Sequence, residues 1–517
     1  MQNCFERETA DIILVNAKVY DPKRDEYFDA LAIKEGAIVG IGEDAKNYLS
    51  TKTVIVDCRG RMIIPAFIDA HTHILGMAAR AGWLDLSKVK SLRELLRIIS
   101  EYAEKVGPGN WILGHSWDES KWSDEKRYPT KKELDEVAPN NPVFIRRIDG
   151  HMAIINSPAM KLLNIPEKII GLEKDKKGEP TGVIKEHALE YAQRRLEVKF
   201  EVVLKGLEKT VKKIQELGIS MVHETLSLEQ LIILAMAGEK GLIPFTVYGF
   251  ILVEYLDKLI ELGIQRGLGG SKIIIGGVKI FADGSIGART AALREPYHDD
   301  PSNMGILFFS EEELEEIFRK ADKAGLQMAI HAIGDRAIDQ VIECLAKAQV
   351  SKDLRHRIEH FEIAWDEHLK KVKKLGIAIS AQPNFVAEWQ MPGGMYEKRL
   401  GRDRWKIMNP FKKILDEGIP LGFGSDCMPL DPIYGLYGAV SHPVKTNRLS
   451  GREALYAYTY GSAFIAHQED LRGTIEVGKI ADLTILSAKN LAEIEKDARN
   501  VRSQGLILGG KILRISY

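Results

Sequence analysis

The chain has 517 residues, of which 45% are hydrophobic, enough for a sizeable core and more than one structural unit. Its 72 basic and 73 acidic residues leave a formal net charge of -1, which favours neither nucleic acid nor an anionic membrane as a partner. The 4 cysteines are scattered without C-x-x-C spacing, which excludes a disulfide scaffold, and the apolar runs are too short to span a membrane. We therefore expect a cytoplasmic protein that acts on a small molecule and is able to form a homo-oligomer. The 28% of charged residues, with many Ile, Glu and Lys, lean towards a thermophilic source.

Both ends of the chain consist of short strand-like segments rich in β-branched residues and separated by turn residues. These segments are residues 10–20, 30–42, 53–58, 473–486 and 505–517. The similar texture of the two ends predicts that they pair. We expect a composite β-sandwich domain built from residues 1–62 and 472–517, with the rest of the chain inserted between them.

The centre of the chain repeats a different pattern, in which an amphipathic helix ends at a glycine and an apolar run follows at once. Gly325 and Gly376 are two such helix ends, and Ser310 with Glu313 forms a capping box at the start of the helix that Gly325 ends. Strands that alternate with helices at this spacing indicate parallel strands. The expected strands are a first one ending at His71, then residues 220–224, 244–249, 273–281, 328–331, 357–360, 378–382 and 421–425. Eight strands close a (β/α)8 barrel, here residues 63–471, with a doubly wound sheet as the alternative.

One long segment does not follow the repeat. Residues 77–200, directly after the first barrel strand, contain their own helices and a strand at residues 143–148. Active sites of such barrels form where the strands end, and long loops there often carry function. We therefore expect an inserted lid or specificity subdomain.

The first barrel strand ends in His71-Thr72-His73. Residues i and i+2 of a strand point to the same side, so these two imidazoles can hold one metal ion. Isolated, the pattern is weak, because histidines on strands are often hydrogen-bonded members of a core. Its weight depends on whether later strands supply further ligands.

Later strands do carry such residues. His331 and His360 each end an apolar run, Asp426 follows another, and Lys279 interrupts a third. Singly, each has a structural alternative: a hydrogen-bonding histidine, a turn-capping aspartate or a lysine that reaches solvent. In a parallel barrel, however, all these strand ends meet at one mouth. Imidazoles and carboxylate without thiolate suit one or two divalent ions, Zn²⁺ above all, with Fe, Mn, Co and Ni also compatible.

The lysine needs its own explanation, because an ammonium group is disfavoured in a buried site beside cations. Its pKa should be lowered there. A neutral amine can add CO₂, and the resulting N6-carboxylated Lys279 can bridge two metal ions. The sequence alone does not show this modification.

This order of ligands, with the H-x-H after a Pro-x-Phe-Ile-Asp strand, resembles the amidohydrolase superfamily. Residues 10–19 and 473–483 are similar to the terminal strands of that superfamily. Within it, residues 149–151, 178–182 and 281–285 resemble the branch that includes N-substituted formamide deformylases. The resemblance covers nearly the whole chain. It implies a reaction class and not a substrate.

The resemblance also implies roles for the ligands. His71 and His73 would bind the more buried metal, His331 and His360 the second, and Lys279 would bridge them as carboxylysine. Asp426 would contact the first metal and act as general base for an attacking hydroxide, with His331 as a second catalytic residue. Substrate contacts are expected from polar groups in the insertion and in the loop after the lysine strand. These are Trp117, Asp118, His151, Asp283 and Arg289.

The function that we predict is metal-dependent hydrolysis of a non-peptide carbon–nitrogen bond, in an amide or an N-formyl or N-acyl compound. Ester or phosphoester hydrolysis and deamination are alternatives that the same ligands would serve. A catalytically idle homologue that regulates or senses a ligand is a third alternative. The complete ligand set argues against idleness, because a binding module does not need six convergent ligands.

Overall fold

The computed structural model of the protein describes residues 9–193, 195–196 and 200–516. Within these residues the largest sheet has eight strands, and every neighbouring pair is parallel. In spatial order the strands are β8 (Phe67–Thr72), β15 (Ile219–Leu226), β16 (Thr246–Leu252), β17 (Ile273–Phe281), β18 (Gln327–Ala332), β19 (Arg357–His360), β20 (Ala378–Ala381) and β21 (Leu421–Phe423). All eight coincide with the predicted strands.

The sheet curls until its first and last strands lie side by side. The backbone N–H of Asp426 donates to the His71 carbonyl at 2.8 Å, and the N–H of Ser425 donates to the Asp69 carboxylate at 2.8 Å. These bonds join the end of β21 to β8 and nearly close the barrel. The predicted TIM-like barrel is therefore confirmed, and the doubly wound alternative is wrong.

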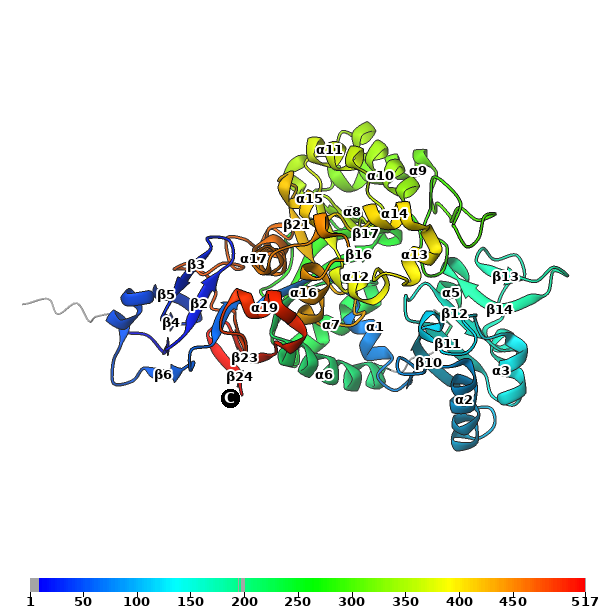
Figure 1. Ribbon diagram of the computed structural model, residues 1–517, viewed down its shortest axis with the longest axis horizontal. Helices are drawn as coiled ribbons and strands as arrows, with labels where there is room; N and C mark the ends of the chain where they lie inside the picture. Colours follow the sequence, from blue (N-terminus) through cyan, green and yellow to red (C-terminus); the bar gives the residue numbers. More distant parts are fainter. Residues whose placement is uncertain (1–8, 194, 197–199, 517) are drawn as a thin grey trace, which may run out of the picture.

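Helices surround the barrel (Figure 1). In chain order they are α1 (Ile74–Ala79), α6 (Phe200–Leu217), α7 (Leu228–Glu239), α8 (Leu256–Glu261), α9 (Glu311–Lys323), α10 (Asp335–Ala348), α11 (Asp366–Leu375), α12 (Pro383–Trp389), α13 (Met395–Leu400), α14 (Arg402–Ile407), α15 (Phe411–Asp416), α16 (Pro432–Val440), α17 (Gly451–Tyr456), α18 (Ser462–Phe464) and α19 (Leu491–Asp497). Ser310 and Glu313 form the predicted capping box of α9, and Gly376 ends α11 with a φ of 71°. No helix of the described residues is both long and apolar enough to cross a membrane.

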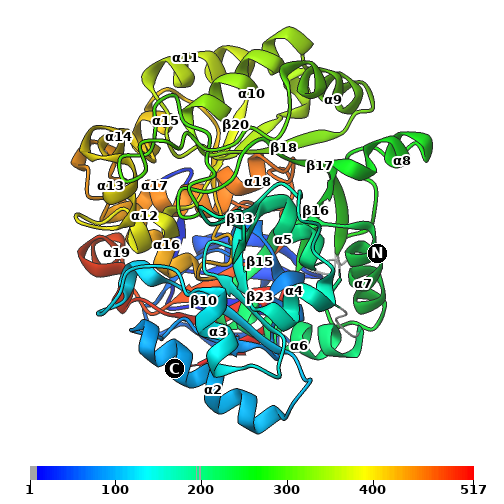
Figure 2. The same ribbon diagram turned by 90° about the vertical axis from the view of Figure 1, so that its right-hand side faces the viewer.

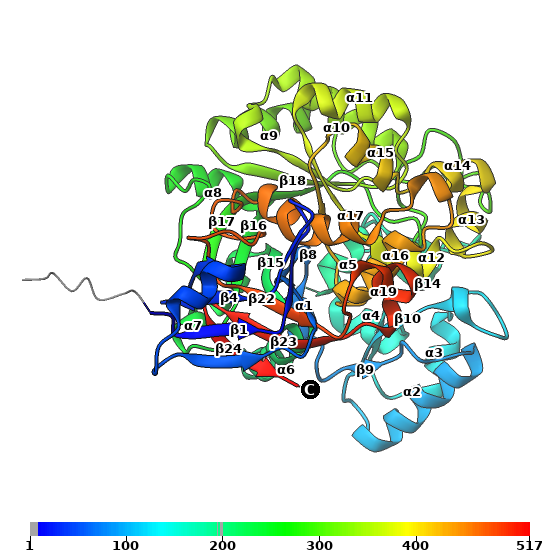
Figure 3. The same cartoon turned by 60° about the vertical axis from the view of Figure 1, so that its left-hand side comes forward.

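The two ends of the chain share a sheet (Figures 1 and 3). In the described residues it has six strands, in the order β24 (Lys511–Ile515), β23 (Ser503–Leu508), β22 (Leu483–Leu486), β7 (Met62–Pro65), β2 (Lys18–Asp21) and β3 (Glu26–Phe28). A second sheet has the order β5 (Ala37–Ile41), β4 (Leu31–Lys34), β1 (Ile12–Val15) and β6 (Val54–Asp57). Apolar residues of both sheets, such as Leu14 and Leu483, belong to one buried cluster.

The predicted pairing of the two ends is thus observed where β22 runs antiparallel to β7. Residues 505–517, expected to be strand-like, contribute to the antiparallel strands β23 and β24, which meet at Gly509 and Gly510. Residues 473–478, expected to be strand-like, form no strand, although Ile475 is buried in the same apolar cluster. The sandwich and its boundaries at residues 62 and 472 stay a prediction.

The inserted segment lies at the opposite end of the molecule from these terminal sheets (Figures 1 and 2). Its sheet has the order β13 (Leu172–Lys174), β14 (Pro180–Lys185), β12 (Met152–Ile155), β11 (Val143–Arg147), β10 (Ile112–Trp117) and β9 (Leu84–Asp85). Its helices are α2 (Leu92–Val106), α3 (Lys131–Val137), α4 (Ser157–Leu163) and α5 (Glu186–Gln193). The strand expected at residues 143–148 is β11. The role of this insertion as a lid stays a prediction.

Candidate metal centre

The H-x-H sequence lies where β8 meets α1, and a glutamate from the neighbouring strand holds this junction. Glu224 on β15 accepts hydrogen bonds from the Thr72 hydroxyl at 2.7 Å and from the Ile74 N–H at 2.8 Å. The first N–H groups of a helix have no partner within the helix, so the carboxylate satisfies one of them. Glu224 thereby fixes the strand end that presents His71 and His73.

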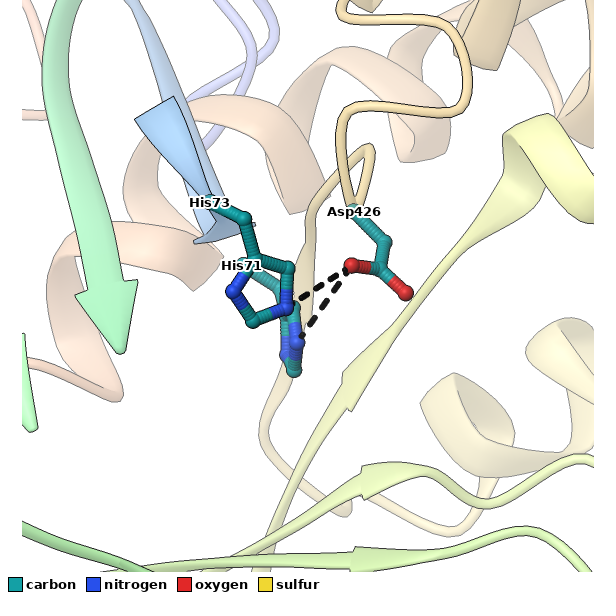
Figure 4. A group of neighbouring side chains, drawn as sticks. All are labelled: His71, His73 and Asp426. Carbon is teal, nitrogen blue, oxygen red and sulfur yellow. Dashed lines mark ion pairs between the residues drawn. The ribbon is translucent and has the colours of Figure 1, made fainter. Parts of the chain in front are cut away.

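His71, His73 and Asp426 form a compact group at the carboxyl end of the barrel (Figure 4). The Oδ1 atom of Asp426 lies 3.1 Å from Nε2 of His73 and 3.8 Å from Nε2 of His71. One ligand atom from each residue lies within 4.8 Å of the others. These separations suit three ligands that share one ion.

A buried carboxylate orients His71. The Nδ1 atom of His71 donates to Oε2 of Glu359, and the other oxygen of Glu359 lies 2.5 Å from Nε of Arg357. The Nδ1 of His71 is thereby occupied, and its Nε2 faces Asp426. Burial raises the pKa of Glu359, but the charge of Arg357 and the hydrogen bond from His71 outweigh it and hold this pKa well below the usual value. Such a partner on the second ring nitrogen fixes the tautomer of a metal-binding histidine.

The other predicted ligands surround this group without belonging to the same 4.8 Å cluster. The ring centroid of His360 lies 4.8 Å from that of His71 and 4.4 Å from that of His331. His331 contacts the carbonyl of Gly284 through Nε2 at 3.0 Å. Lys279 is buried on β17, and its Nζ has no hydrogen-bond partner among the described residues. The structure therefore brings all six predicted ligands to one end of the barrel.

Burial keeps the imidazoles of His71, His331 and His360 neutral, as metal ligands must be. It lowers the pKa of His71 to about 4, with a further decrease from the nearby Lys279. Burial likewise lowers the pKa of His331 and of His360. Burial also lowers the pKa of Lys279 to about 8, against the opposing charges of Glu359 and Asp426. Burial raises the pKa of Asp426, but the hydrogen bond from His73 and the nearby positive charges outweigh it, and the net shift is downward.

Two of these residues have a backbone that non-glycine residues seldom adopt. His360 has a φ of 71° and Asp426 a φ of 53°. Left-handed residues of this kind cost free energy and persist where the surrounding structure requires them, often at functional sites. Both positions immediately end or follow a barrel strand, where the chain must turn and still direct its side chain into the barrel mouth.

The donor set fits a divalent metal. Two buried polar atoms, Nζ of Lys279 and Nδ1 of His360, lack a hydrogen-bond partner in the described part of the chain. Buried polar atoms without a partner are rare and call for an explanation such as an ion. A metal ligated by these atoms would compensate for the desolvation that they suffer on folding.

Two predicted substrate contacts are already engaged within the protein. Trp117 is fully buried in the apolar core of the insertion, and its Nε1 donates to the Ile145 carbonyl at 3.1 Å. Asp118 accepts a hydrogen bond from the Ser120 hydroxyl at 2.6 Å and lies 3.4 Å from Arg147. These contacts account for the burial of both residues without a ligand, and their role in substrate binding stays a prediction.

Of the other three predicted contacts, His151 and Arg289 each have a charged partner within the protein. The ring of His151 is 5.3 Å from that of His331, and its Nδ1 is 3.1 Å from a carboxylate oxygen of Glu186. Burial lowers the pKa of His151, but the charge of Glu186 outweighs this effect and raises it to about 9. Arg289 pairs with Asp299 at 2.8 Å.

Asp283, the remaining predicted contact, is fully buried beside His331. Its carboxylate accepts the backbone N–H groups of Ala292, Ile333 and Gly334 at 2.8 to 3.0 Å. Its Oδ1 lies 3.5 Å from Nε2 of His331. Asp283 therefore ties together the loops that follow β17 and β18, and its contact with a substrate stays untested.

Glu224 and Glu359 belong to the site but were not predicted from the sequence. Both are buried acidic residues of barrel strands, and a buried carboxylate needs a partner. That signal was available in residues 357–360, where a glutamate directly precedes His360. The sequence gives no indication that its partner is His71, 288 positions away.

A profile of the Amidohydrolase family matches residues 54–514, nearly the whole chain. The chain belongs to the amidohydrolase family. It is thus an enzyme, and the solved structures that it resembles include metal-dependent hydrolases, while His71, His73 and Asp426 form a group able to hold a metal ion. A divalent metal is accordingly its cofactor.

Relatives of this amidohydrolase resemble it over their full length. It is 31% identical to the putative amidohydrolase YtcJ of Bacillus subtilis, over 94% of this chain and 96% of that protein. It is 27% identical to an N-substituted formamide deformylase of Arthrobacter pascens, over 92% of this chain and 93% of the relative. Among solved structures, an uncharacterized metal-dependent hydrolase of Pyrococcus horikoshii is 31% identical with a TM-score of 0.77, over 94% of this chain and 99% of the other.

Proposed function

We propose that this amidohydrolase cleaves a non-peptide carbon–nitrogen bond in a small amide, N-formyl or N-acyl compound, with Asp426 as general base. The observation that carries the proposal is the group of His71, His73 and Asp426, whose ligand atoms lie within 4.8 Å of one another at the barrel mouth. The similarity to a formamide deformylase over 92% of the chain supports a carbonyl–nitrogen bond as the target.

The residues proposed to hold one or two divalent ions are His71, His73, Lys279, His331, His360 and Asp426. Imidazole and carboxylate ligands suit Zn²⁺. A divalent ion bound here supplies two effects, because it makes water more acidic and polarises a carbonyl group.

Asp426 is suited to move a proton, because its lowered pKa leaves it ionised at neutral pH. In the proposed reaction the water oxygen bonds to the carbonyl carbon, and Asp426 accepts the proton that the water loses. The carbon–nitrogen bond then breaks, and Asp426 returns this proton to the leaving nitrogen. The products are a carboxylic acid and an amine.

His151 is proposed to stabilise the negative charge that develops on the carbonyl oxygen. Its ring lies beside that of His331, and its raised pKa keeps it protonated at neutral pH. A charged N–H donor directed at this oxygen stabilises the tetrahedral transition state. His331 contributes to the same step by orienting this part of the site.

We further propose that Lys279 is N6-carboxylated. Its Nζ is buried and unpartnered among the described residues, between His331, His360 and the Glu359 carboxylate. Addition of CO₂ to the neutral amine forms a carbamate and releases one proton. The product is an anion whose two oxygens can each bind a metal ion, which removes the cost of a buried, unpaired ammonium.

A hydrolysis screen tests the proposal. N-formyl, N-acyl and cyclic amides are incubated with the enzyme loaded with Zn²⁺, Mn²⁺ or Co²⁺ in turn, next to matched esters, phosphoesters and aminopurines. Amine release from the amide set at a rate that depends on the added metal is the expected result. Turnover confined to the esters, phosphoesters or aminopurines would replace the proposal by one of these alternatives.

A further inference from the structure

Two arginines beside the metal centre lack an acidic partner. Arg80 follows α1, the helix directly after the H-x-H sequence, and Arg146 lies on β11 of the insertion; both are half-buried. The guanidinium of Arg80 forms no hydrogen bond or ion pair with any residue that the structure describes. Arg146 donates through Nε and a terminal nitrogen to the Gly150 carbonyl, at 3.1 and 2.7 Å, and to no described carboxylate.

Arg80 ends the short helix α1, which begins directly after His73, and Arg146 bonds to Gly150, the neighbour of His151, whose ring lies 5.3 Å from that of His331. The charge of Asp426 acts on both guanidinium groups. Arg80 also interacts with Glu224, and Arg146 with Asp149 and Glu186. Asp149 is already paired with Arg147 at 2.7 Å. They are also near enough to each other that Arg80 lowers the pKa of Arg146, after the larger effect of burial. Two positive charges thus face one region of the barrel mouth.

The carboxylates of this region are already engaged by other groups. Glu224 accepts from Thr72 and the start of α1, and Asp426 contacts the two histidines. Glu186 pairs with His151 and accepts a hydrogen bond from Thr290 at 2.6 Å. None of them is free to neutralise the arginines, and Asp426 would in addition give its charge to a metal.

Half-burial of two like charges is unfavourable unless an anion joins them. Burial already lowers the pKa of Arg80 and brings that of Arg146 to about 9. A guanidinium presents its N–H groups in a planar fork that matches the oxygens of a carboxylate. An anion placed between the two arginines would accept hydrogen bonds from both guanidinium groups and would lie next to the reacting bond.

We propose that Arg80 and Arg146 bind a carboxylate of the substrate, so that the enzyme acts on acidic amides. This inference rests on the proposed function, because it names the substrate class of the same site. It assigns specificity to the junction between α1 and the insertion, which places one arginine on the barrel and the other on the inserted sheet. In this arrangement the two arginines hold the substrate, and Asp426 accepts the proton and returns it to the leaving nitrogen.

The test compares one ligand in two charge states. N-Formylphenylalanine and its carboxamide differ in the carboxylate alone, and binding of each to the metal-loaded enzyme is measured by calorimetry, with hydrolysis followed in parallel. The acid is expected to bind about tenfold or more tightly than the carboxamide. Arg80→Met and Arg146→Met should each remove most of this preference, because they weaken binding of the acid far more than binding of the carboxamide. Salt at 0.5 M (about a 4 Å screening length) should likewise weaken binding of the acid selectively.

Arg97→Met is the matched control, because Arg97 is exposed on α2 and pairs with Glu101. This variant should bind both ligands as the wild type does. Circular dichroism checks folding, and Arg80→Gln replaces Arg80→Met if the latter does not fold. Equal or undetectable binding of both ligands to the wild type, or an undiminished preference in both arginine variants, would overturn the inference.

Binding and turnover separate this inference from the function on which it rests. An arginine-dependent preference for the acid without any hydrolysis of amides would support the carboxylate site and refute the proposed reaction. Equal hydrolysis of acid and carboxamide, unchanged in the arginine variants, would support the reaction and refute the carboxylate site.

Discussion

The Nδ1 atom of His71 lies 2.5 Å from Oε2 of Glu359, which stands on the barrel strand of His360. One ligand of the proposed metal site is therefore held by the residue that directly precedes another ligand. Arg357, two positions earlier on the same strand, holds the second oxygen of Glu359 and also donates to the Ala70 carbonyl at 3.0 Å. These contacts connect β8 to β19 across the interior of the barrel.

The first prediction concerns this contact. Glu359→Gln keeps one acceptor oxygen for His71 but places an NH2 donor against Arg357 and removes the negative charge, so the imidazole becomes a weaker ligand. We expect metal affinity to fall by about 10- to 100-fold. Competition with a chromogenic chelator measures it. Glu312→Gln, at an exposed position of α9, is the control. Equal metal affinity of the wild type and Glu359→Gln would show that Glu359 has only a packing role.

The second prediction separates base from ligand. Asp426→Asn cannot accept a proton, whereas His71 and His73 remain to bind metal. We expect kcat to fall by about 100-fold or more, with metal content largely retained by elemental analysis. Asp403→Asn, at a fully exposed carboxylate, should behave like the wild type. Full activity of Asp426→Asn would rule out Asp426 as the base.

The third prediction concerns the carbamate. Protein supplied with carbon-13 bicarbonate should show a carbamate resonance by NMR, and Lys279→Met should lose it together with part of the bound metal. The wild type is expected to hold one to two equivalents of metal. Lys212→Met, which alters a solvent-exposed lysine of α6, is the control. A spectrum without carbamate, or one that Lys279→Met leaves unchanged, would mean an unmodified lysine.

The barrel and its ligands could be predicted because the relevant signals are local. Apolar runs after helix-ending glycines such as Gly376 mark strands in the sequence, and a histidine or aspartate at or just after the end marks β8, β18, β19 and β21. Parallel topology then brings the ends of distant strands together without further information. His71, His331 and His360 follow this logic directly.

The remainder depends on contacts between residues far apart in the sequence, which no local pattern encodes. Nothing near Glu359 indicates that it lies against His71, and nothing near Trp117 tells a pocket-lining tryptophan from one in the core of the insertion. Residues 473–478 are expected to be strand-like because they are rich in β-branched residues, but Ile475 lies in the core and the segment forms no strand. Burial alone produces an apolar pattern there.

The fourth prediction concerns the stability of the insertion at acidic pH. Glu133 caps α3 and lies 2.6 Å from Arg127, and this contact, against a smaller opposing effect of burial, lowers the pKa of Glu133 from 4.5 to about 2. A carboxylate with a lowered folded pKa stabilises the folded state above its unfolded pKa. The contribution is lost as the pH falls from about 4.5 towards 2.

Arg127 is 41% exposed, so solvent screens the pair and we expect Glu133→Gln to cost only about 1 kcal/mol at pH 7. Urea unfolding of both proteins between pH 7 and pH 3 measures the difference in the free energy of unfolding. It should stay constant down to about pH 5 and narrow below this value. Glu136→Gln, at an exposed position of the same helix, should show no such pH dependence. A difference that is constant over the whole range would mean that Glu133 acts through its neutral hydrogen bonds alone.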